Sequence, residues 1–229
     1  GFTTEELLDK VLCSKAELLE GLQALHAIDI DGRWRLMTWE FEANTMDMVL
    51  AQVVAADHPL DAVPVDDCVA ALDMLPAVAV RHCLTSRFGE PGADGTARLD
   101  AAKVAMLRAE QVLMAPRGGD LLVADFLEEW QDTLPTGIEA DMEMVKGNVL
   151  LDGDAVRYFP AAALRTPARP HTYTPRFQEL FAVRERWALD DLLPFIVPLV
   201  GATCTKDALL LSYTRSTLLE DGSRLFSKR

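Results

Sequence analysis

The stretch Ile28-Asp-Ile-Asp-Gly-Arg-Trp-Arg-Leu36 alternates apolar and polar residues on both sides of the dipeptide Asp31-Gly32. This pattern predicts a β-hairpin, because a type I′ turn needs a positive φ at both central residues and Asp-Gly tolerates it. The same dipeptide recurs at Asp94-Gly95, Asp152-Gly153 and Asp221-Gly222, so that successive glycines are spaced 63, 58 and 69 positions apart. The sequence therefore predicts three complete repeats of about sixty residues and one partial repeat.

Residues with helical periodicity precede each hairpin. Three pairs have the capping-box spacing that marks a helix start: Thr3 with Glu6, Ser14 with Glu17, and Thr136 with Glu139. Helices are expected near 4–12 and 15–26; near 41–56, 65–74 and 77–88; near 101–115, 120–132 and 137–146; and near 175–187, 189–200 and 205–215. Three helices followed by a hairpin is the order of a winged helix, a helix-turn-helix with an added wing.

The fold prediction is therefore a mainly α protein with small β-hairpin wings, of the α+β class, arranged as a tandem winged-helix array. The repeats are expected at 1–38, a partial unit without its first helix, at 39–99, at 100–165, and at 166–229. Prolines break helices, and they gather before the last repeat at Pro160, Pro167, Pro170 and Pro175. Because the sequence does not begin with Met, we expect it to be a fragment that lacks its natural amino-terminal part.

The charge is unevenly distributed along the chain. The formal net charge is −14, but residues 169–229 hold nine Lys/Arg against seven Asp/Glu, so all of the excess acid precedes them. The acidic part is expected to repel DNA, whereas the last repeat is not. No uncharged apolar run approaches the ~18 residues of a membrane span, so no membrane contact is expected.

A group of basic residues in the last repeat is the candidate DNA-binding site. Its members fall at the start and end of the expected third helix, in the wing and just after it: Lys206, Arg215, Arg224, Lys228 and Arg229. Such residues neutralise phosphates without reading bases. The alternative is an ordinary solvated surface near a chain end.

Sequence motifs for catalysis, metal or cofactor binding are lacking. Gly118-Gly119 is followed by Asp120 and not by Lys-Ser/Thr, so it is no phosphate loop, and no G-x-S-x-G elbow occurs. The paired acids Asp66-Asp67 and Asp190-Asp191 are expected at helix starts, where they offset the helix dipole. The cysteines are widely spaced, which favours buried or half-buried reduced thiols over a disulfide or zinc site: Cys13, Cys68, Cys83 and Cys204. We expect no enzyme activity, no cofactor and no metal.

Several segments resemble the Dcc-type sister chromatid cohesion proteins. They run from Phe126 to Gly137, from Arg176 to Trp187 and on through Pro194, from Leu210 to Ser216, and from Leu225 to Arg229. The stretch from Glu6-Leu-Leu-Asp9 through Gly32-Arg-Trp-Arg35 is similar too, and the likeness is weakest near 55–100. One departure is Phe195, where the family usually has Tyr; another is that the family's amino-terminal barrel segment is not in this sequence.

The resemblance implies a nuclear, non-ATPase subunit of the alternative, cohesion-linked replication factor C clamp loader, which loads and unloads the sliding clamp PCNA. It implies winged helices that dock on the catalytic subunit of DNA polymerase epsilon and on double- or single-stranded DNA, and an absent barrel that joins two other subunits of the loader. PCNA is then an indirect partner, in DNA replication and the cell cycle.

Two alternatives to that function stay open. The first is a pure protein-docking scaffold without DNA contact, since an acidic surface suits basic partners. The second is a sequence-specific transcription regulator, which the segment Thr205–Arg215 disfavours because it offers few side chains that read base edges.

Overall fold

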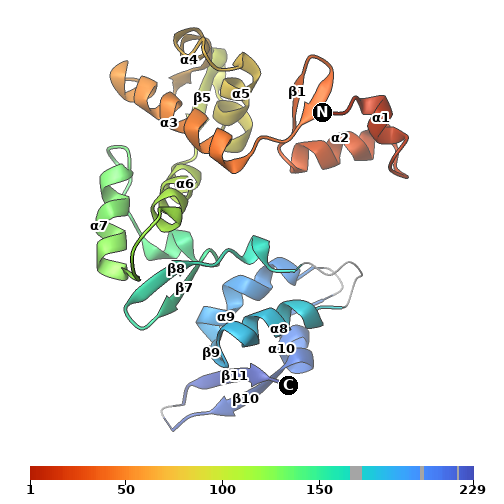
Figure 1. Ribbon diagram of the computed structural model, residues 1–229, viewed down its shortest axis with the longest axis vertical. Coiled ribbons are helices and arrows are strands. Elements are labelled where there is room, and N and C mark those ends of the chain that lie inside the picture. Colours follow the sequence, from red (N-terminus) through yellow and green to blue (C-terminus); the bar gives the residue numbers. More distant parts are fainter. Residues whose placement is uncertain (166–171, 202–203, 221) are drawn as a thin grey trace. The chain divides into compact units, whose positions relative to one another are not determined.

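A computed structural model describes residues 1–165, 172–201, 204–220 and 222–229 (Figure 1). It divides into two compact lobes. The amino-terminal lobe comprises residues 1–111 with 130–140, and the carboxy-terminal lobe comprises 112–129 with 141–229. Helices predominate and the sheets are small and antiparallel, so the predicted α+β class is confirmed. No helix in the described part of the chain is long and apolar enough to cross a membrane.

The amino-terminal lobe begins with two short helices and a hairpin: α1 (Thr4–Leu8), α2 (Lys15–Ala24), β1 (Ile28–Ile30) and β2 (Arg33–Arg35). Both predicted capping boxes at its helix starts are confirmed. Asp31 and Gly32 have φ of 53° and 75°, which confirms the predicted type I′ turn.

The rest of this lobe is built around one long helix. Its elements are α3 (Trp39–Ala55), β3 (Val63–Pro64), α4 (Val65–Ala71), α5 (Ala77–His82), a π-helical turn (Cys83–Arg87), β4 (Gly89–Pro91), β5 (Thr96–Leu99) and α6 (Ala101–Met114). Met46, Val49 and Val53 recur at helical spacing along α3 and are fully buried.

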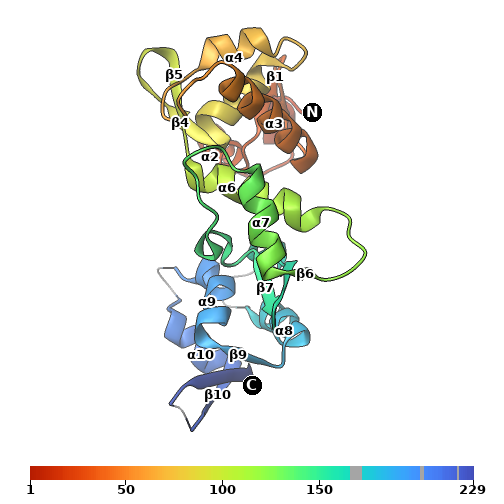
Figure 2. The same ribbon diagram turned by 90° about the vertical axis from the view of Figure 1, so that its left-hand side faces the viewer.

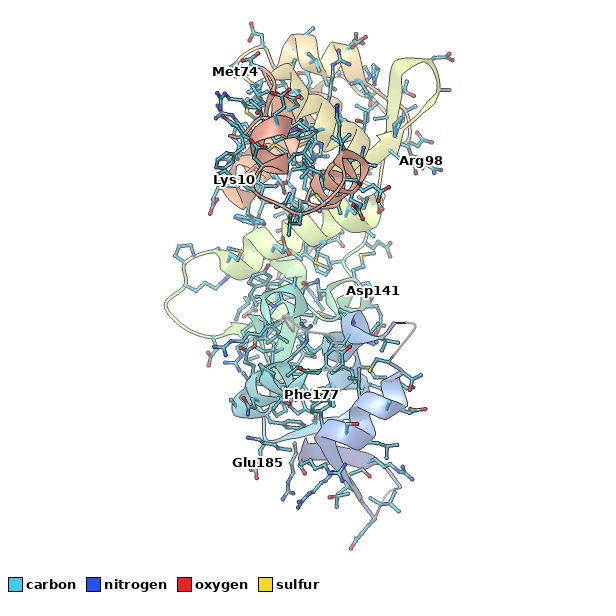
Figure 3. The ribbon with its side chains drawn as sticks, turned by 90° about the vertical axis from the view of Figure 1, so that its right-hand side faces the viewer. Lys10, Met74, Arg98, Asp141, Phe177 and Glu185 are labelled. Atoms are coloured by element: carbon cyan, nitrogen blue, oxygen red, sulfur yellow. The ribbon has the colours of Figure 1, made fainter. Side chains whose placement is uncertain are left out.

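The carboxy-terminal lobe ends in a helical layer on a three-stranded sheet. The elements after α6 are β6 (Leu121–Leu122), α7 (Val123–Thr133), β7 (Val149–Asp152), β8 (Ala155–Tyr158), α8 (Thr174–Val183), β9 (Arg186–Ala188), α9 (Leu189–Ile196), α10 (Lys206–Tyr213), β10 (Thr214–Leu218) and β11 (Arg224–Lys228). Helices α8, α9 and α10 lie on one side of the last sheet (Figure 2). Phe177 of α8 lies within the core between them (Figure 3).

The three-stranded sheets share one connectivity. Their strand orders are β3-β5-β4, β6-β8-β7 and β9-β11-β10. In each sheet a short strand in front of a helix pairs with the second strand of the following hairpin, which becomes the central strand. A winged helix requires this arrangement of helix-turn-helix and wing. The tandem winged-helix array and its boundaries at 38, 99 and 165 stay predictions.

The structure corrects the predicted helices where proline, glycine or a short strand intervenes. The helix expected at 137–146 is wrong, because Gly137 adopts φ +92° after Pro135 and only a 3₁₀ turn forms at Met142–Val145. The Thr136–Glu139 pair consequently caps nothing. The helix expected at 175–187 ends at Val183. The strands β3, β6 and β9 were not predicted.

The third hairpin differs from the prediction in its turn type. Asp152 pairs with Ala155, so the central residues of the third hairpin are Gly153 and Asp154, and only Gly153 has a positive φ, of 61°. That is the requirement of a type II′ turn and not of the predicted type I′. Asp221, in the fourth turn, lies outside the described residues, as do Pro167 and Pro170.

Candidate nucleic-acid interface

The last sheet has two different faces, which the register of its strands fixes. Strand β11 pairs with both β10 and β9, antiparallel on each side. Residues directly opposite one another carry their side chains on the same face. Trp187, Phe226 and Ser216 therefore share the inner face, where Trp187 and Phe226 are buried. The alternate residues of each strand lie on the outer face.

Trp187 determines which side of β9 faces outward. Its ring is fully buried and lies edge-on to Phe195, with the ring centroids 5.6 Å apart. Its Nε1–H donates to the carbonyl oxygens of Arg184 and Leu180, at 2.9 and 3.3 Å, as a buried indole requires. Because side chains alternate along a strand, the burial of Trp187 holds Arg186 on the outer face.

The outer face carries a row of two arginines and a serine. Ser227 of β11 pairs with Arg186 on one side and with Arg215 on the other. Neighbouring strands lie about 4.8 Å apart, so the Cα atoms of the two arginines lie about 10 Å apart. Both arginines are exposed, and neither forms an ion pair with a residue that the structure describes. We call this row the outer arginine face.

Arg186 was missed by the sequence analysis. Its segment was assigned to a helix over 175–187, which hid the alternation of exposed Arg186, buried Trp187 and exposed Ala188. Three residues are too few for a period-two pattern to be recognised by itself. The tryptophan between two exposed positions is the only local signal.

Lys206 and Arg224 lie on a different surface from Arg215. With Leu211 and Phe226 they line a groove of about 370 Å³ between α10 and the hairpin, which also includes Asp207. Lys206 is the first residue of α10, and Arg224 is the first of β11. Leu211 is 73% exposed, so this groove is largely apolar with cations at its margin.

The last two predicted residues lie near the carboxy-terminal end of α10. Lys228 is exposed and pairs with Thr214. Arg229 donates from its backbone N–H to the carbonyl oxygen of Tyr213 and from Nη1 to that of Leu211. Its guanidinium therefore satisfies a helix-end carbonyl.

The five predicted residues thus do not form one cluster. The structure brings Lys206 and Arg224 together at the groove and places Arg215 on the opposite face of the sheet, in line with Arg186. The residues predicted as one DNA-binding group are therefore divided between two surfaces of the last sheet. The outer arginine face is the better candidate for a phosphate site, because two exposed arginines share one face of the sheet there without an acidic residue in the row.

Comparison with known proteins decides the family. Residues 1–196 match the family model described as "Sister chromatid cohesion protein Dcc1". The chain belongs to the Dcc1 family. It is 33% identical over 232 residues to sister chromatid cohesion protein DCC1 of Xenopus laevis, and 31% identical over 232 residues to that of Homo sapiens. Both comparisons cover 100% of the chain and 58% of the relative.

The Saccharomyces cerevisiae DCC1 protein is 24% identical over 233 residues, with 93% of the chain and 58% of the relative covered. The Dcc1-family chain thus spans a little over half the length of these relatives. Their names place the family in sister chromatid cohesion. Both Lys206 and the last hairpin lie beyond the residues that the family model matches, although the vertebrate relatives align with the whole chain.

In this Dcc1-family chain, the segment from Arg176 to Trp187 holds the last sheet to its helices. Arg176 is 2% exposed and donates from Nε to the carbonyl oxygen of Phe195 at 2.8 Å, from Nη2 to that of Ala161 at 2.8 Å, and from Nη1 to that of Leu164 at 3.3 Å. Burial lowers the pKa of its guanidinium. Arg176 therefore ties α8 to the end of α9 and to the segment from Ala161 to Leu164.

One thiol of this Dcc1-family chain is more exposed than predicted. All four are free cysteines. Cys68 and Cys83 are buried and Cys204 is half-buried, as predicted, but Cys13 is exposed. Burial raises the pKa of Cys83 to about 12, which disfavours its thiolate. No group of three metal-binding side chains occurs among the described residues.

Two histidines of the amino-terminal lobe form a half-buried pair. His26 precedes β1 and His82 ends α5; their ring centroids are 5.9 Å apart. His26 Nδ1 and His82 Nε2 are buried, and neither atom has a hydrogen-bond partner among the described residues. Desolvation, with a smaller contribution from Arg87, lowers the pKa of both rings, while Glu42 opposes it.

This histidine pair predicts a loss of stability in acid. A histidine whose pKa is lowered in the fold binds its proton more readily when unfolded, so stability is present above the unfolded pKa of ~6.5 and is lost as the pH falls below it. We expect His82→Gln to reduce the decline of the unfolding midpoint between about pH 7 and pH 5. Urea titrations at several pH values measure this, with His58→Gln as the matched control. An equal decline in wild type and His82→Gln contradicts the prediction.

Proposed function

We propose that this chain is part of a non-catalytic accessory subunit of the alternative replication factor C clamp loader. In this role it acts in the nucleus, in PCNA loading and unloading, DNA replication and sister chromatid cohesion. Family membership supports the proposal, since the relatives are named for sister chromatid cohesion. The repeated sheet connectivity supports it as well, because small helix-turn-helix units with wings serve as docking modules.

Direct DNA contact is proposed for the carboxy-terminal end of the chain. The observation that carries it is the outer arginine face, where Arg186 and Arg215 flank Ser227 on an exposed sheet. Guanidinium groups form bidentate hydrogen bonds with phosphate oxygens, and a serine hydroxyl adds a donor. Contacts of this kind hold double- or single-stranded DNA without regard to sequence.

Protein partners are proposed for the acidic remainder of the chain. Residues before 169 carry all of the net negative charge, which keeps DNA away from them and attracts basic surfaces. The proposed partners are the catalytic subunit of DNA polymerase epsilon and the other loader subunits, with PCNA reached through the loader.

A second candidate function is protein docking alone, without DNA. The groove beside α10 favours it, because Leu211 in its lining is 73% exposed. Leu218, which pairs with Arg224 in the hairpin, is 65% exposed. Exposed apolar side chains next to Lys206 and Arg224 suit a protein ligand with apolar and acidic residues better than a phosphate backbone.

A salt series distinguishes the two functions. The 229-residue chain is titrated onto labelled double- and single-stranded DNA between about 50 and 200 mM salt. The proposed function expects binding that weakens steeply with salt and is lost when Lys206, Arg215, Arg224 and Lys228 are replaced by Glu. Unchanged affinity of that variant contradicts DNA contact by this end of the chain. Absence of binding at low salt, together with capture of the polymerase catalytic subunit, supports the docking scaffold.

A further inference from the structure

In the first repeat, Phe2 pairs with the hairpin as a short strand would, and it precedes the two helices of that repeat. We call Phe2 the strand equivalent of this repeat. Phe2 and Trp34 exchange backbone hydrogen bonds, with Phe2 N–H donating to Trp34 O at 3.3 Å and Trp34 N–H donating to Phe2 O at 2.8 Å. Trp34 lies in β2, the second strand of its hairpin. Phe2 therefore holds the place that β3, β6 and β9 hold in the other sheets.

In each of those other repeats a helix directly precedes this short strand. Helix α3 precedes β3, α6 precedes β6, and α8 precedes β9, with connections of seven residues (56–62), six (115–120) and two (184–185). Within their own lobes, α3 and α8 bury apolar stripes that include Met46 and Val49 of α3 and Phe177 and Leu180 of α8. This helix therefore supplies much of the core of a repeat.

The first repeat has an open groove instead of such a core. Apolar side chains of the strand equivalent, both helices and the hairpin line a space of about 540 Å³: Phe2, Leu7, Leu22, Leu25, Trp34 and Leu36. Among the described residues, neither α1 nor α2 buries a side chain. Leu25 is 62% and Leu36 is 61% exposed. The first repeat thus has well-formed helix starts and a well-formed hairpin, but the apolar side chains between them remain open to solvent.

We propose that this groove binds an amphipathic α-helix that leads into Phe2. The helix completes the core of the first repeat, as α3 and α8 complete the cores of theirs. The occupant belongs to the same polypeptide, because in all three other repeats the helix joins the strand through a short connection. The relatives are long enough to provide it, since the chain covers 58% of the Xenopus laevis protein. The side of the helix toward the groove carries apolar residues three and four apart, and its other side is polar.

The proposed helix packs in the groove and has no role in DNA binding. Filling it buries Phe2, Leu25 and Leu36, which form the largest group of exposed apolar side chains on this repeat. The groove is lined by residues between Gly1 and Leu36, and none of them belongs to the outer arginine face, so the proposal stands whether or not that face binds DNA.

The test compares the 229-residue chain with the same chain extended by the ~25 natural residues that lead into it, enough for one helix and a short connection. Binding of the apolar dye ANS is measured by fluorescence, and protection of the Phe2 and Trp34 amides by hydrogen exchange. We expect the 229-residue chain to bind the dye, and the extended chain to lose most of that signal and to gain at least tenfold protection at both amides.

Two single substitutions test whether the dye binds in the groove. Leu25→Glu, in the groove, is expected to reduce the dye signal of the 229-residue chain severalfold, whereas Leu12→Glu, at the most exposed leucine outside the groove lining, is expected to leave it unchanged. Undiminished dye binding and unchanged exchange in the extended chain overturn the proposal. So does a concentration-dependent dimer of the extended chain that Leu25→Glu abolishes, because the occupant is then a second copy.

Discussion

Replacing Arg176 by methionine is expected to destabilise the carboxy-terminal lobe by about 3 kcal/mol, because three buried carbonyl groups lose their donor together. The methionine side chain fills most of the space but has no N–H groups. The oxygens of Leu164 and Phe195 then lose the guanidinium donor in a buried site, while that of Ala161 keeps only the backbone N–H of Leu164 at 3.3 Å. A buried carbonyl left without its donor costs about 1–3 kcal/mol. Hydrogen exchange of the amides in β9 and β11, recorded as a function of urea concentration, measures the change in stability of this lobe alone.

The matched control is Arg165→Met in the same lobe. Arg165 pairs with Glu179 at 2.9 Å, but its side chain is 76% exposed. An exposed pair of this kind contributes about 0–1 kcal/mol, so this variant is expected to unfold close to wild type. Equal unfolding midpoints for the two variants would show that Arg176 acts only as packing or not at all. Arg176→Lys separates charge from geometry, because an ammonium cannot reach three carbonyls in the planar arrangement of a guanidinium.

Local rules predicted the first hairpin and the first helices of the chain correctly. Asp31-Gly32 is a turn because both residues tolerate a positive φ, and no distant contact changes that requirement. Thr3 and Ser14 each accept a hydrogen bond from the backbone three residues on, an interaction contained within one helical turn. Features that one turn of chain determines were therefore available from the sequence.

The missing strands show where local rules fail. Strands β3 and β6 have two residues each and exist because they pair with the centre of a sheet formed later in the chain. Two residues carry no periodicity, so nothing in their own sequence separates them from the start of the next helix. The same cause hid β9, which was merged with α8 although the chain becomes extended at Arg184.

The candidate site depended on one of these strands. The sequence showed positive charge at Arg215 and Arg224 but not that they lie on opposite faces of a sheet, because a face is defined by register. Only the pairing of β9 with β11 brings Arg186 into line with Arg215. Charge could be counted from the sequence, whereas the surface that presents the charge could not.

The outer arginine face gives the second large prediction. Replacing Arg186 and Arg215 together by glutamine is expected to weaken DNA binding of the 229-residue chain by about 100-fold at low salt, if two charge-assisted contacts of ~1.5 kcal/mol each are lost. The slope of log affinity against log salt is expected to fall by about 2, since two fewer phosphates are neutralised. Fluorescence anisotropy across a salt series measures both quantities in one experiment.

The contrasting pair is Lys206→Gln with Arg224→Gln, which removes the same charge from the groove on the other side of the sheet. If phosphates bind the outer arginine face, this pair changes affinity less than threefold and leaves the salt slope near that of wild type, because long-range effects of exposed charges are screened within about 10 Å. If the groove pair abolishes binding and the outer pair does not, the DNA lies along α10 and the hairpin instead. Equal losses from both pairs would mean that net charge, and not the geometry of either face, governs the interaction. Two matched variants of identical charge therefore separate the position of the DNA from the presence of DNA binding.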